Sequence, residues 1–284
     1  MTLLLVGLAV NAWTLSPAPA YRPSMDDGLH RLETILRDME GAAVAFSGGR
    51  DSALLLAAAA RVLPRRRVVA VLGVSPLLHG RERTAAAAVA AQVEVALIEV
   101  RLTPLSESGI VANGPDRCYH CKHALLTRLL MEARTLGLPL VEGSHRDDDP
   151  ARRPGAQALH ELSVRSPLRE AGFGRAAVSA LSRRLGLPTA DRASESCLAT
   201  RIPTGTPLDA ALLARIESAE DILVAAGFAG CRARHHGDLL RLEVAATDLP
   251  RISRTRLRTR LLAELRALGW RHVTLDMAGY QEGR

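Results

Sequence analysis

The sequence predicts an α/β protein in which a parallel sheet is followed by a smaller α+β domain. Two observations support this prediction. In the first part of the chain, short apolar runs rich in β-branched residues alternate with longer segments of helical character, an alternation typical of right-handed βαβ units. Residues 228–284 instead contain short strand-like runs on either side of one helical segment, which is typical of an α+β arrangement.

The elements of the first part follow one another in regular order. The predicted strands are short, continuous apolar runs, as expected where helices cover both faces of a parallel sheet. The strands are expected at residues 42–46, 68–74, 93–102 and 138–142, and the helices at 27–39, 53–62, 81–92, 122–136 and 174–185. Since ligands of such sheets bind at the carboxyl ends of the strands, we expect the site there.

The second part contains fewer and more separated elements. A loop-like composition extends from Pro188 to Pro207, and an amphipathic helix is expected at residues 210–226. A further helix at 255–268 lies between strand-like runs at 241–244 and 272–277. We therefore place one domain at residues 26–190 and a smaller one at 191–284.

Length and composition indicate a globular protein. The chain has 284 residues, 48% of them hydrophobic, and four cysteines, which are too few for a secreted fold held by disulfides. Residues 1–10 form an apolar run similar to a signal-peptide core, but no positive segment precedes it and it is too short to span a bilayer as a helix. We expect a cytoplasmic protein with an N-terminal extension, disordered or not, at residues 1–25; secretion is the alternative.

The net charge favours an acidic partner. The formal charge is +7, but the basic residues are spread along the chain and aromatic residues make up only 3%, so stacking platforms for a nucleic acid are scarce. We therefore expect an acidic small molecule as substrate, with no nucleic acid and no membrane as partner. Of the 37 basic residues only Lys122 is a lysine.

A glycine-containing loop follows the first predicted strand. It reads Ser47-Gly48-Gly49-Arg50-Asp51-Ser52 and leads into a predicted helix. Glycines allow a close approach of the backbone, and the N–H groups at a helix N-terminus bind anions. An ordinary turn would also use Gly and Ser, and the Gly-Lys-Ser/Thr of a Walker A loop is absent.

This loop resembles the PP-loop of the ATP pyrophosphatases, which implies a function for each of its residues. In that superfamily the loop holds the pyrophosphate while ATP is split to activate a substrate as an adenylate. The resemblance implies that Ser47, Gly48, Gly49, Asp51 and Ser52 bind ATP. It also implies that Asp51 helps to place Mg²⁺.

Three cysteines form a second group of candidate residues. Cys118 and Cys121 are three residues apart at the predicted start of a helix, so that their sulfurs share one face and can bind one metal or cluster. Cys197 lies in the loop before the second domain. Each could instead be a small buried apolar residue, as free cysteines often are.

Several longer segments extend the resemblance over nearly the whole chain. Together with the glycine loop, they resemble the LarE-type ATP-dependent sulfur transferases of nickel-pincer cofactor synthesis in order and spacing. The segments are residues 113–122 (NGPDRCYHCK), 166–172 (SPLREAG), 197–205 (CLATRIPTG), 232–237 (RARHHG) and 241–243 (RLE).

The resemblance implies a reaction and a set of catalytic residues. ATP adenylates the carboxylates of pyridinium-3,5-biscarboxylic acid mononucleotide, and sulfur displaces AMP to leave thiocarboxylates. The catalytic residues would be Asp51, Cys118, Cys121 and Cys197. In one version of such enzymes the cysteine at the position of Cys197 gives up its own sulfur; in the other, three cysteines hold a [4Fe-4S] cluster with one open iron. Three matching cysteines favour the cluster.

The resemblance also implies substrate-binding residues and an assembly. Arg201, Arg232, Arg234 and Lys122 would bind phosphate or carboxylate groups, and guanidinium forks suit a nucleotide with several negative charges. A solvated surface role is the alternative for any single arginine. The family suggests a hexamer of identical chains.

Two departures and two alternatives accompany this interpretation. Arg50 stands where a small or apolar residue is expected, and residues 142–145 (EGSH) replace a family segment near the adenylate. A PP-loop tRNA thiolase or lysidine-type ligase would share the loop but leaves the three cysteines unexplained. A non-catalytic nucleotide-binding or metal-binding module would bind ATP without releasing pyrophosphate.

Overall fold

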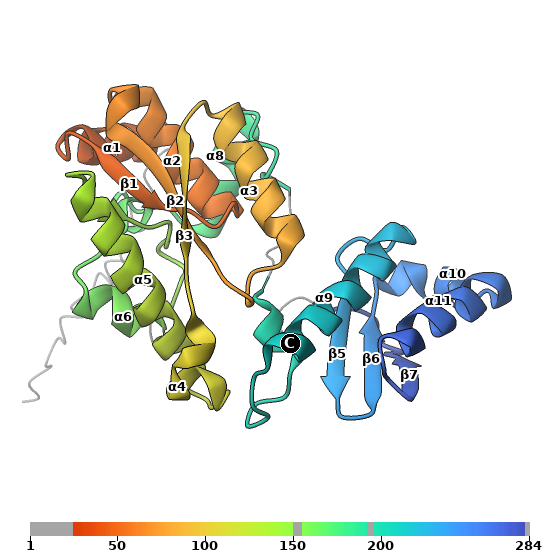
Figure 1. The fold of residues 1–284 in the computed structure, drawn as a ribbon. Helices are drawn as coiled ribbons and strands as arrows, with labels where there is room; N and C mark the ends of the chain where they lie inside the picture. Colours follow the sequence, from red (N-terminus) through yellow and green to blue (C-terminus); the bar gives the residue numbers. More distant parts are fainter. Residues whose placement is uncertain (1–24, 150–154, 192–195, 282–284) are drawn as a thin grey trace, which may run out of the picture.

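A computed structural model describes residues 25–149, 155–191 and 196–281. Apart from Met25, the predicted N-terminal extension lies outside these residues. The first part contains one parallel sheet in the strand order β3-β2-β1-β4 (Figure 1). Its strands are β1 (Ala42–Ala45), β2 (Val68–Val74), β3 (Ala96–Arg101) and β4 (Leu140–Val141).

Helices cover both faces of this sheet (Figure 1). One face carries α1 (Met25–Arg37), α2 (Arg50–Val62), α3 (Gly80–Gln92) and α8 (Arg175–Arg184); the other carries α5 (Arg117–Thr135) and α6 (Gly155–Glu161). Successive strand residues alternate between the two cores: Ala42 and Val44 pack with the first group of helices, and Ala43 packs with the second. This alternation follows from the pleat of a strand, and it explains why β1 and β4 are apolar at every position, whereas the edge strand β3 carries Glu99 and Arg101.

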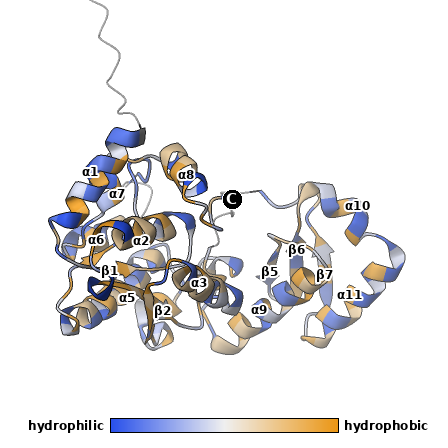
Figure 2. Ribbon diagram, turned by 90° about the horizontal axis from the view of Figure 1, so that it is seen from above, coloured by the Kyte–Doolittle hydropathy of each residue, from blue (hydrophilic) through white to orange (hydrophobic). Residues whose placement is uncertain are grey.

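The C-terminal part is built around a small mixed sheet in the order β5-β6-β7. Strands β5 (Arg232–His236) and β6 (Leu239–Glu243) are antiparallel, whereas β6 and β7 (His272–Leu275) are parallel. Helices α9 (Ala210–Ala225), α10 (Leu249–Ile252) and α11 (Thr255–Ala267) accompany this sheet. Hydrophobic and hydrophilic residues alternate along the ribbon of α11 (Figure 2), and its Leu261 and Leu265 are buried in the core of this part.

The core of the C-terminal part also includes residues from the first part. Leu77 and Ile110, which follow β2 and belong to α4 (Ser108–Val111) respectively, are buried together with Phe228 and Trp270. Leu198 and Ile202 from the Cys197 segment join the same cluster. Apolar packing therefore continues from the carboxyl edge of the parallel sheet into the C-terminal part.

The predicted elements are present, with several differences in extent. Strand β2 has the predicted bounds, but β3 begins three residues late because α3 ends at Gln92 and the chain then turns at Glu94, whose φ is 56°. Helix α5 begins at Arg117 instead of residue 122, which places both cysteines of the pair within it. Strand β5 was not predicted, nor were the short helices α4, α6, α7 (Pro167–Glu170) and α10.

Among the described residues, no helix is long and apolar enough to cross a bilayer.

Candidate functional site

The glycine loop connects β1 directly to α2. Gly48 has a φ of 74°, in the left-handed region, and a Cβ at this position would lie 2.7 Å from the Cβ of Ala86. Both facts require glycine, because a side chain would be strained and would collide with α3. The exposed Ser47 and the buried Ser52 close the loop with hydroxyl groups 3.2 Å apart.

Asp51 lies in the first turn of α2, where a carboxylate is favoured by the free N–H groups of the helix. Burial raises the pKa of its carboxyl group; His145 opposes this effect and Asp148 adds to it. A half-buried carboxylate with a second carboxylate nearby provides the oxygen ligands that Mg²⁺ prefers. The Asp51 environment is therefore consistent with the predicted magnesium role.

The segment after β4 packs against the same helix N-terminus. A Cβ on Gly143 would lie 2.9 Å from the backbone nitrogen of Ser52, so only glycine allows the two backbones to approach. The preceding Glu142 is buried and accepts hydrogen bonds from Ser144 and Ser166. Its Oε2 lies 3.7 Å from Nζ of Lys122. Lys122 on α5 is thus placed at the carboxyl edge of the sheet, one residue from Cys121.

His145, at the carboxyl edge of the sheet, is buried and has a ring nitrogen without a hydrogen-bond partner among the described residues. Its side chain is 2% exposed, and Nδ1 lies 3.6 Å from Oδ2 of Asp148 without forming a hydrogen bond. The same Oδ2 accepts the backbone N–H of His145 at 3.0 Å. Asp148 and His145 were not selected as site residues from the sequence, although the acidic run after His145 was a signal that could have led to them.

The cysteine pair lies in the first turns of α5. Cys118 is exposed and Cys121 is half-buried. Burial and the nearby thiol groups of Cys197 and Cys118 raise the pKa of Cys121 to about 11. The Cys121 thiol is therefore within electrostatic range of both Cys118 and Cys197. Arg117 donates to Sγ of Cys118 at 3.4 Å and to the carbonyl oxygen of Ala199 at 3.1 Å.

A polar clamp joins the two cysteine segments. Asn113 is 1% exposed, and its Nδ2 donates to the carbonyl oxygens of Pro203 and Thr206 at 2.9 and 3.0 Å. The backbone carbonyl oxygen of Asn113 accepts the N–H of Gly205 at 2.9 Å. All three partners come from the segment that follows Cys197, so the clamp fixes this segment against the turn that precedes the helix carrying Cys118 and Cys121.

Arg201 occupies an internal position. It is 2% exposed, and its Nε donates to Glu220 of α9 at 2.8 Å. Its Nη1 donates to the carbonyl oxygens of Ser196 and Cys197 at 2.7 and 3.1 Å. These contacts hold the backbone at Cys197 in place, whereas the predicted contact with substrate stays a prediction.

The other two arginines of the prediction lie on β5. Arg232 is 2% exposed and contacts Tyr280 through a hydrogen bond of 3.2 Å and by lying over its ring. Arg234 is paired with Glu243 and donates to the carbonyl oxygen of Thr200 at 3.1 Å. It lines a cavity of about 170 Å³ together with Arg241, Glu243, Asp276, Gly279 and Gln281. This volume suits a phosphate or carboxylate group better than a whole nucleotide, because ligand pockets for larger molecules start near 300 Å³.

The predicted residues therefore fall into three neighbouring groups. The first contains the glycine loop with Asp51, and Lys122 approaches it from α5 through Glu142. The second contains Cys118, Cys121 and Cys197. The third contains Arg234, which reaches back to Thr200 in the Cys197 segment. Arg201 and Arg232 are buried behind the second and third groups.

Fold and site together define a class: an α/β protein with a doubly covered parallel sheet, a glycine loop at its carboxyl edge and a group of three thiols beside it. No family model matches the sequence. The chain is 34% identical over 254 residues to the pyridinium-3,5-bisthiocarboxylic acid mononucleotide synthase of Lactiplantibacillus plantarum, covering 89% of this chain and 91% of that protein. The chain belongs to the family of this synthase, which confirms the resemblance to the LarE-type proteins.

Two uncharacterized proteins are also similar to the chain. A protein of Synechocystis is 32% identical over 261 residues, which cover 92% of this chain and 97% of that protein. A protein of Methanocaldococcus jannaschii is 25% identical over 173 residues, covering 61% of this chain and 67% of that protein.

Proposed function

We propose that the protein is an ATP-dependent sulfur transferase that converts the carboxylates of pyridinium-3,5-biscarboxylic acid mononucleotide to thiocarboxylates. The observation that carries this proposal is the connection between the thiol group and the glycine loop. Lys122, next to Cys121, contacts Glu142, and Gly143 packs on the backbone at Asp51 and Ser52. Activation and sulfur transfer can therefore act on one bound substrate, and family membership supports the same assignment.

The first step is activation of a carboxylate. A carboxylate oxygen of the substrate attacks the α-phosphorus of ATP, the bond to the β-phosphate oxygen breaks, and pyrophosphate leaves. The N–H groups of the glycine loop and the first turn of α2 would bind the departing pyrophosphate. Asp51 would hold Mg²⁺, and Lys122 would act as a compact point charge near the phosphates.

The second step replaces the adenylate by sulfur. A sulfur nucleophile attacks the carbonyl carbon and AMP leaves with the former carboxylate oxygen. Cys118, Cys121 and Cys197 fit the three-thiolate donor set of a [4Fe-4S] cluster, since two are exposed and all three lie in one electrostatic neighbourhood. Such a cluster would supply one iron without a protein ligand, at which a sulfide can be held. The high pKa of Cys121 without a metal is compatible with this role, because a coordinating thiol is deprotonated by the metal.

The alternatives differ in what they require. Sacrifice of the Cys197 sulfur uses the same activation step and is also compatible with an exposed Cys197. The tRNA thiolase and the non-catalytic module are less well supported, because the similarity extends over 89% of the chain to a synthase named for a mononucleotide product. We further propose a homo-oligomer, a hexamer by resemblance, and a cytoplasmic location.

The experiment that tests this function is anaerobic purification followed by turnover. Iron and acid-labile sulfide are measured first, and then intact mass after reaction with ATP and the biscarboxylated nucleotide. About four irons per chain, lost in Cys118→Ala, Cys121→Ala or Cys197→Ala, with unchanged protein mass and repeated turnover, would support the cluster. Cys231→Ala serves as the control, since this cysteine is buried in the C-terminal core.

The remaining outcomes separate the other possibilities. Absence of iron with loss of about one H₂S from Cys197 would support the sacrificial route. Absence of both pyrophosphate and a thiocarboxylated product would contradict the proposed function.

A further inference from the structure

The N-terminus of α3 is joined to α9 by hydrogen bonds to two of its backbone N–H groups. Oε1 of Glu217 on α9 accepts the N–H of Gly80 at 2.6 Å, and Nδ1 of His79 accepts the N–H of Arg81 at 3.3 Å. A Cβ on Gly80 would lie 3.1 Å from the same Oε1, so glycine permits this close approach. The helix is therefore capped both by its own N-cap residue and by a carboxylate 137 positions away in the chain.

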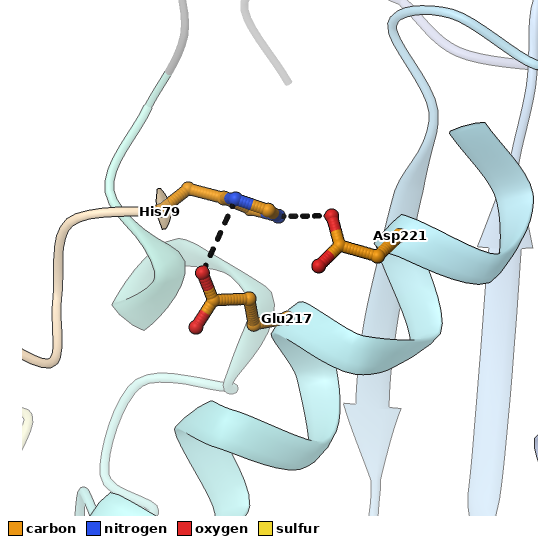
Figure 3. A group of neighbouring side chains, drawn as sticks. All are labelled: His79, Glu217 and Asp221. Atoms are coloured by element: carbon orange, nitrogen blue, oxygen red, sulfur yellow. Dashed lines mark ion pairs between the residues drawn. The ribbon is translucent and has the colours of Figure 1, made fainter. Parts of the chain in front are cut away.

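His79, the N-cap residue of α3, has a different neighbour at each ring nitrogen (Figure 3). Burial and the nearby Arg81 lower the pKa of His79, so the ring is neutral at neutral pH. Because Nδ1 accepts the N–H of Arg81, Nε2 carries the proton, and it faces Oδ1 of Asp221 at 3.5 Å (Figure 3). Arg81 also donates to Glu220 at 2.7 Å. Acidic side chains on one face of α9 thus hold the first turn of α3.

The Cys197 segment lies between the loop before α3 and α9, and it is bonded to both. In the loop, the carbonyl oxygen of Leu77 accepts the N–H of Leu198 at 2.9 Å, and the two side chains are buried in the same core. On the other side, Arg201 donates both to Glu220 of α9 and to the carbonyl oxygen of Cys197. The position of Cys197 therefore depends on where the start of α3 lies relative to α9.

The same helix α3 also supports the glycine loop. A Cβ on Gly48 would lie 2.7 Å from the Cβ of Ala86, which belongs to the buried face of α3. Because the turns of a helix move together, the first turn of α3 and its contact with the glycine loop keep a fixed separation. The contact between α3 and α9 thus relates the loop that would bind ATP to the segment that carries Cys197.

We propose that Glu217 is a positioning residue for sulfur transfer: by holding the start of α3 against α9, it keeps the Cys197 segment in register with the glycine loop. This role rests on the proposed function, since it concerns an adenylate formed at that loop. When sulfur is misplaced, water attacks the carbonyl carbon of the adenylate, AMP leaves and the original carboxylate is restored. Pyrophosphate is then released without formation of a thiocarboxylate.

Glu217→Ala tests this role in the anaerobically purified full chain. We expect hydrogen exchange at the Leu198 amide to become about tenfold faster, as for the loss of one hydrogen bond to a charged group, while exchange in the glycine loop stays unchanged. Thiocarboxylate formed per pyrophosphate released should fall by a similar factor. The side chain of Glu217 is 31% exposed, so the variant is expected to keep its fold.

Two matched variants separate positioning from general damage. Glu217→Gln keeps an oxygen that can accept the N–H of Gly80, so it should retain most of the thiocarboxylate formed per pyrophosphate. Ser218→Ala removes an exposed hydroxyl group from the next position of α9 and should behave like the parent protein in both measurements.

Three results would overturn the proposal. Unchanged exchange at Leu198 in Glu217→Ala would show that this contact does not hold the Cys197 segment. A parallel fall of pyrophosphate and thiocarboxylate, at a constant ratio, would show that Glu217 supports the fold or ATP binding instead. Absence of pyrophosphate release from the parent protein would contradict the proposed function itself, a failure that is separate from the first two because those concern the variant alone.

Discussion

The side-chain amide of Asn113 donates to the carbonyl oxygen of Pro203 at 2.9 Å and joins the two cysteine segments across 90 positions of the chain. Asn113 adopts a φ of 51°, which asparagine tolerates better than most residues. The relative position of Cys118, Cys121 and Cys197 therefore depends on Asn113, which is not itself a proposed ligand of the cluster.

Asn113→Ala should destabilise this junction. The variant removes the side-chain donor to the carbonyl oxygens of Pro203 and Thr206 and the side-chain acceptor of Arg117 Nη1, and each such hydrogen bond contributes about 0.5 to 1.5 kcal/mol. Urea denaturation measures the loss, and iron content after anaerobic purification should fall with it. Gln92→Ala, which removes one exposed side-chain bond, is the control. Full iron content and unchanged stability in Asn113→Ala would contradict the clamp.

Gly48→Ala should damage both the fold and nucleotide binding. Strain at a left-handed non-glycine residue costs on the order of 1 to 3 kcal/mol, and the contact with Ala86 adds to it. Gly186→Ala is the matched control, because its φ is 66° but the space around it is open. We expect a lower urea midpoint for Gly48→Ala than for Gly186→Ala and loss of ATP binding by calorimetry in the first variant alone. An equal fall in the urea midpoint and in ATP affinity for the two variants would show that the contact between residue 48 and Ala86 of α3 is unimportant.

Glu220→Gln should be among the most destabilising single changes in the C-terminal part. Glu220 is fully buried and pairs with both Arg201 and Arg81, and removing one partner of a buried ion pair costs about 3 to 5 kcal/mol. Chemical denaturation measures this cost against Glu264→Gln, an exposed acid on α11. A difference between the two variants below about 1 kcal/mol, the range of surface pairs, would refute the importance of the buried pair.

Lys122→Met should reduce thiocarboxylate formation while leaving the fold intact. Its ammonium group is one-third exposed and lies 3.7 Å from Glu142, so little stability depends on it. Pyrophosphate release and product formation are measured together, with Arg128→Met on the exposed side of α5 as the control. Loss of at least about tenfold in rate, or about 1.4 kcal/mol, is expected. A variant with normal pyrophosphate release and product yield would remove Lys122 from the site.

Asp147→Asn should change the pH dependence of stability. The hydrogen bond from the backbone N–H of Arg175 lowers the pKa of Asp147 in the folded protein. Because the folded pKa is depressed, the contribution to stability is complete above the unfolded value near 3.8 and is lost as pH falls through the folded pKa. The variant should therefore lose less stability than the parent between pH 5 and about 3. Asp238→Asn, at an exposed pair, serves as the comparison in acid titrations of the urea midpoint.

Much of the fold could be predicted because its signals are local. The bounds of β2 follow from an uninterrupted apolar run, and the glycine loop is recognisable from six consecutive residues. Strand β5 escaped prediction because its sequence, RARHH, lacks apolar alternation; it is a strand through pairing with β6. The extra helical turn at the start of α5 was missed for a similar reason, since it is polar.

The candidate site also combines residues that local sequence patterns indicate with contacts that only the tertiary structure reveals. Asp51 and the three cysteines could be predicted as site residues from the sequence, because they lie in segments that resemble family motifs and because the spacing of Cys118 and Cys121 places two sulfurs on one face of a helix. It could not reveal that Arg201 is buried against Glu220, or that His79 meets Asp221 of α9. The partner of a buried charge depends on how helices pack, and packing brings together residues that are far apart in the chain. Local pattern therefore determined the elements and the reactive groups, whereas tertiary contacts decided which of those groups face each other and which are enclosed.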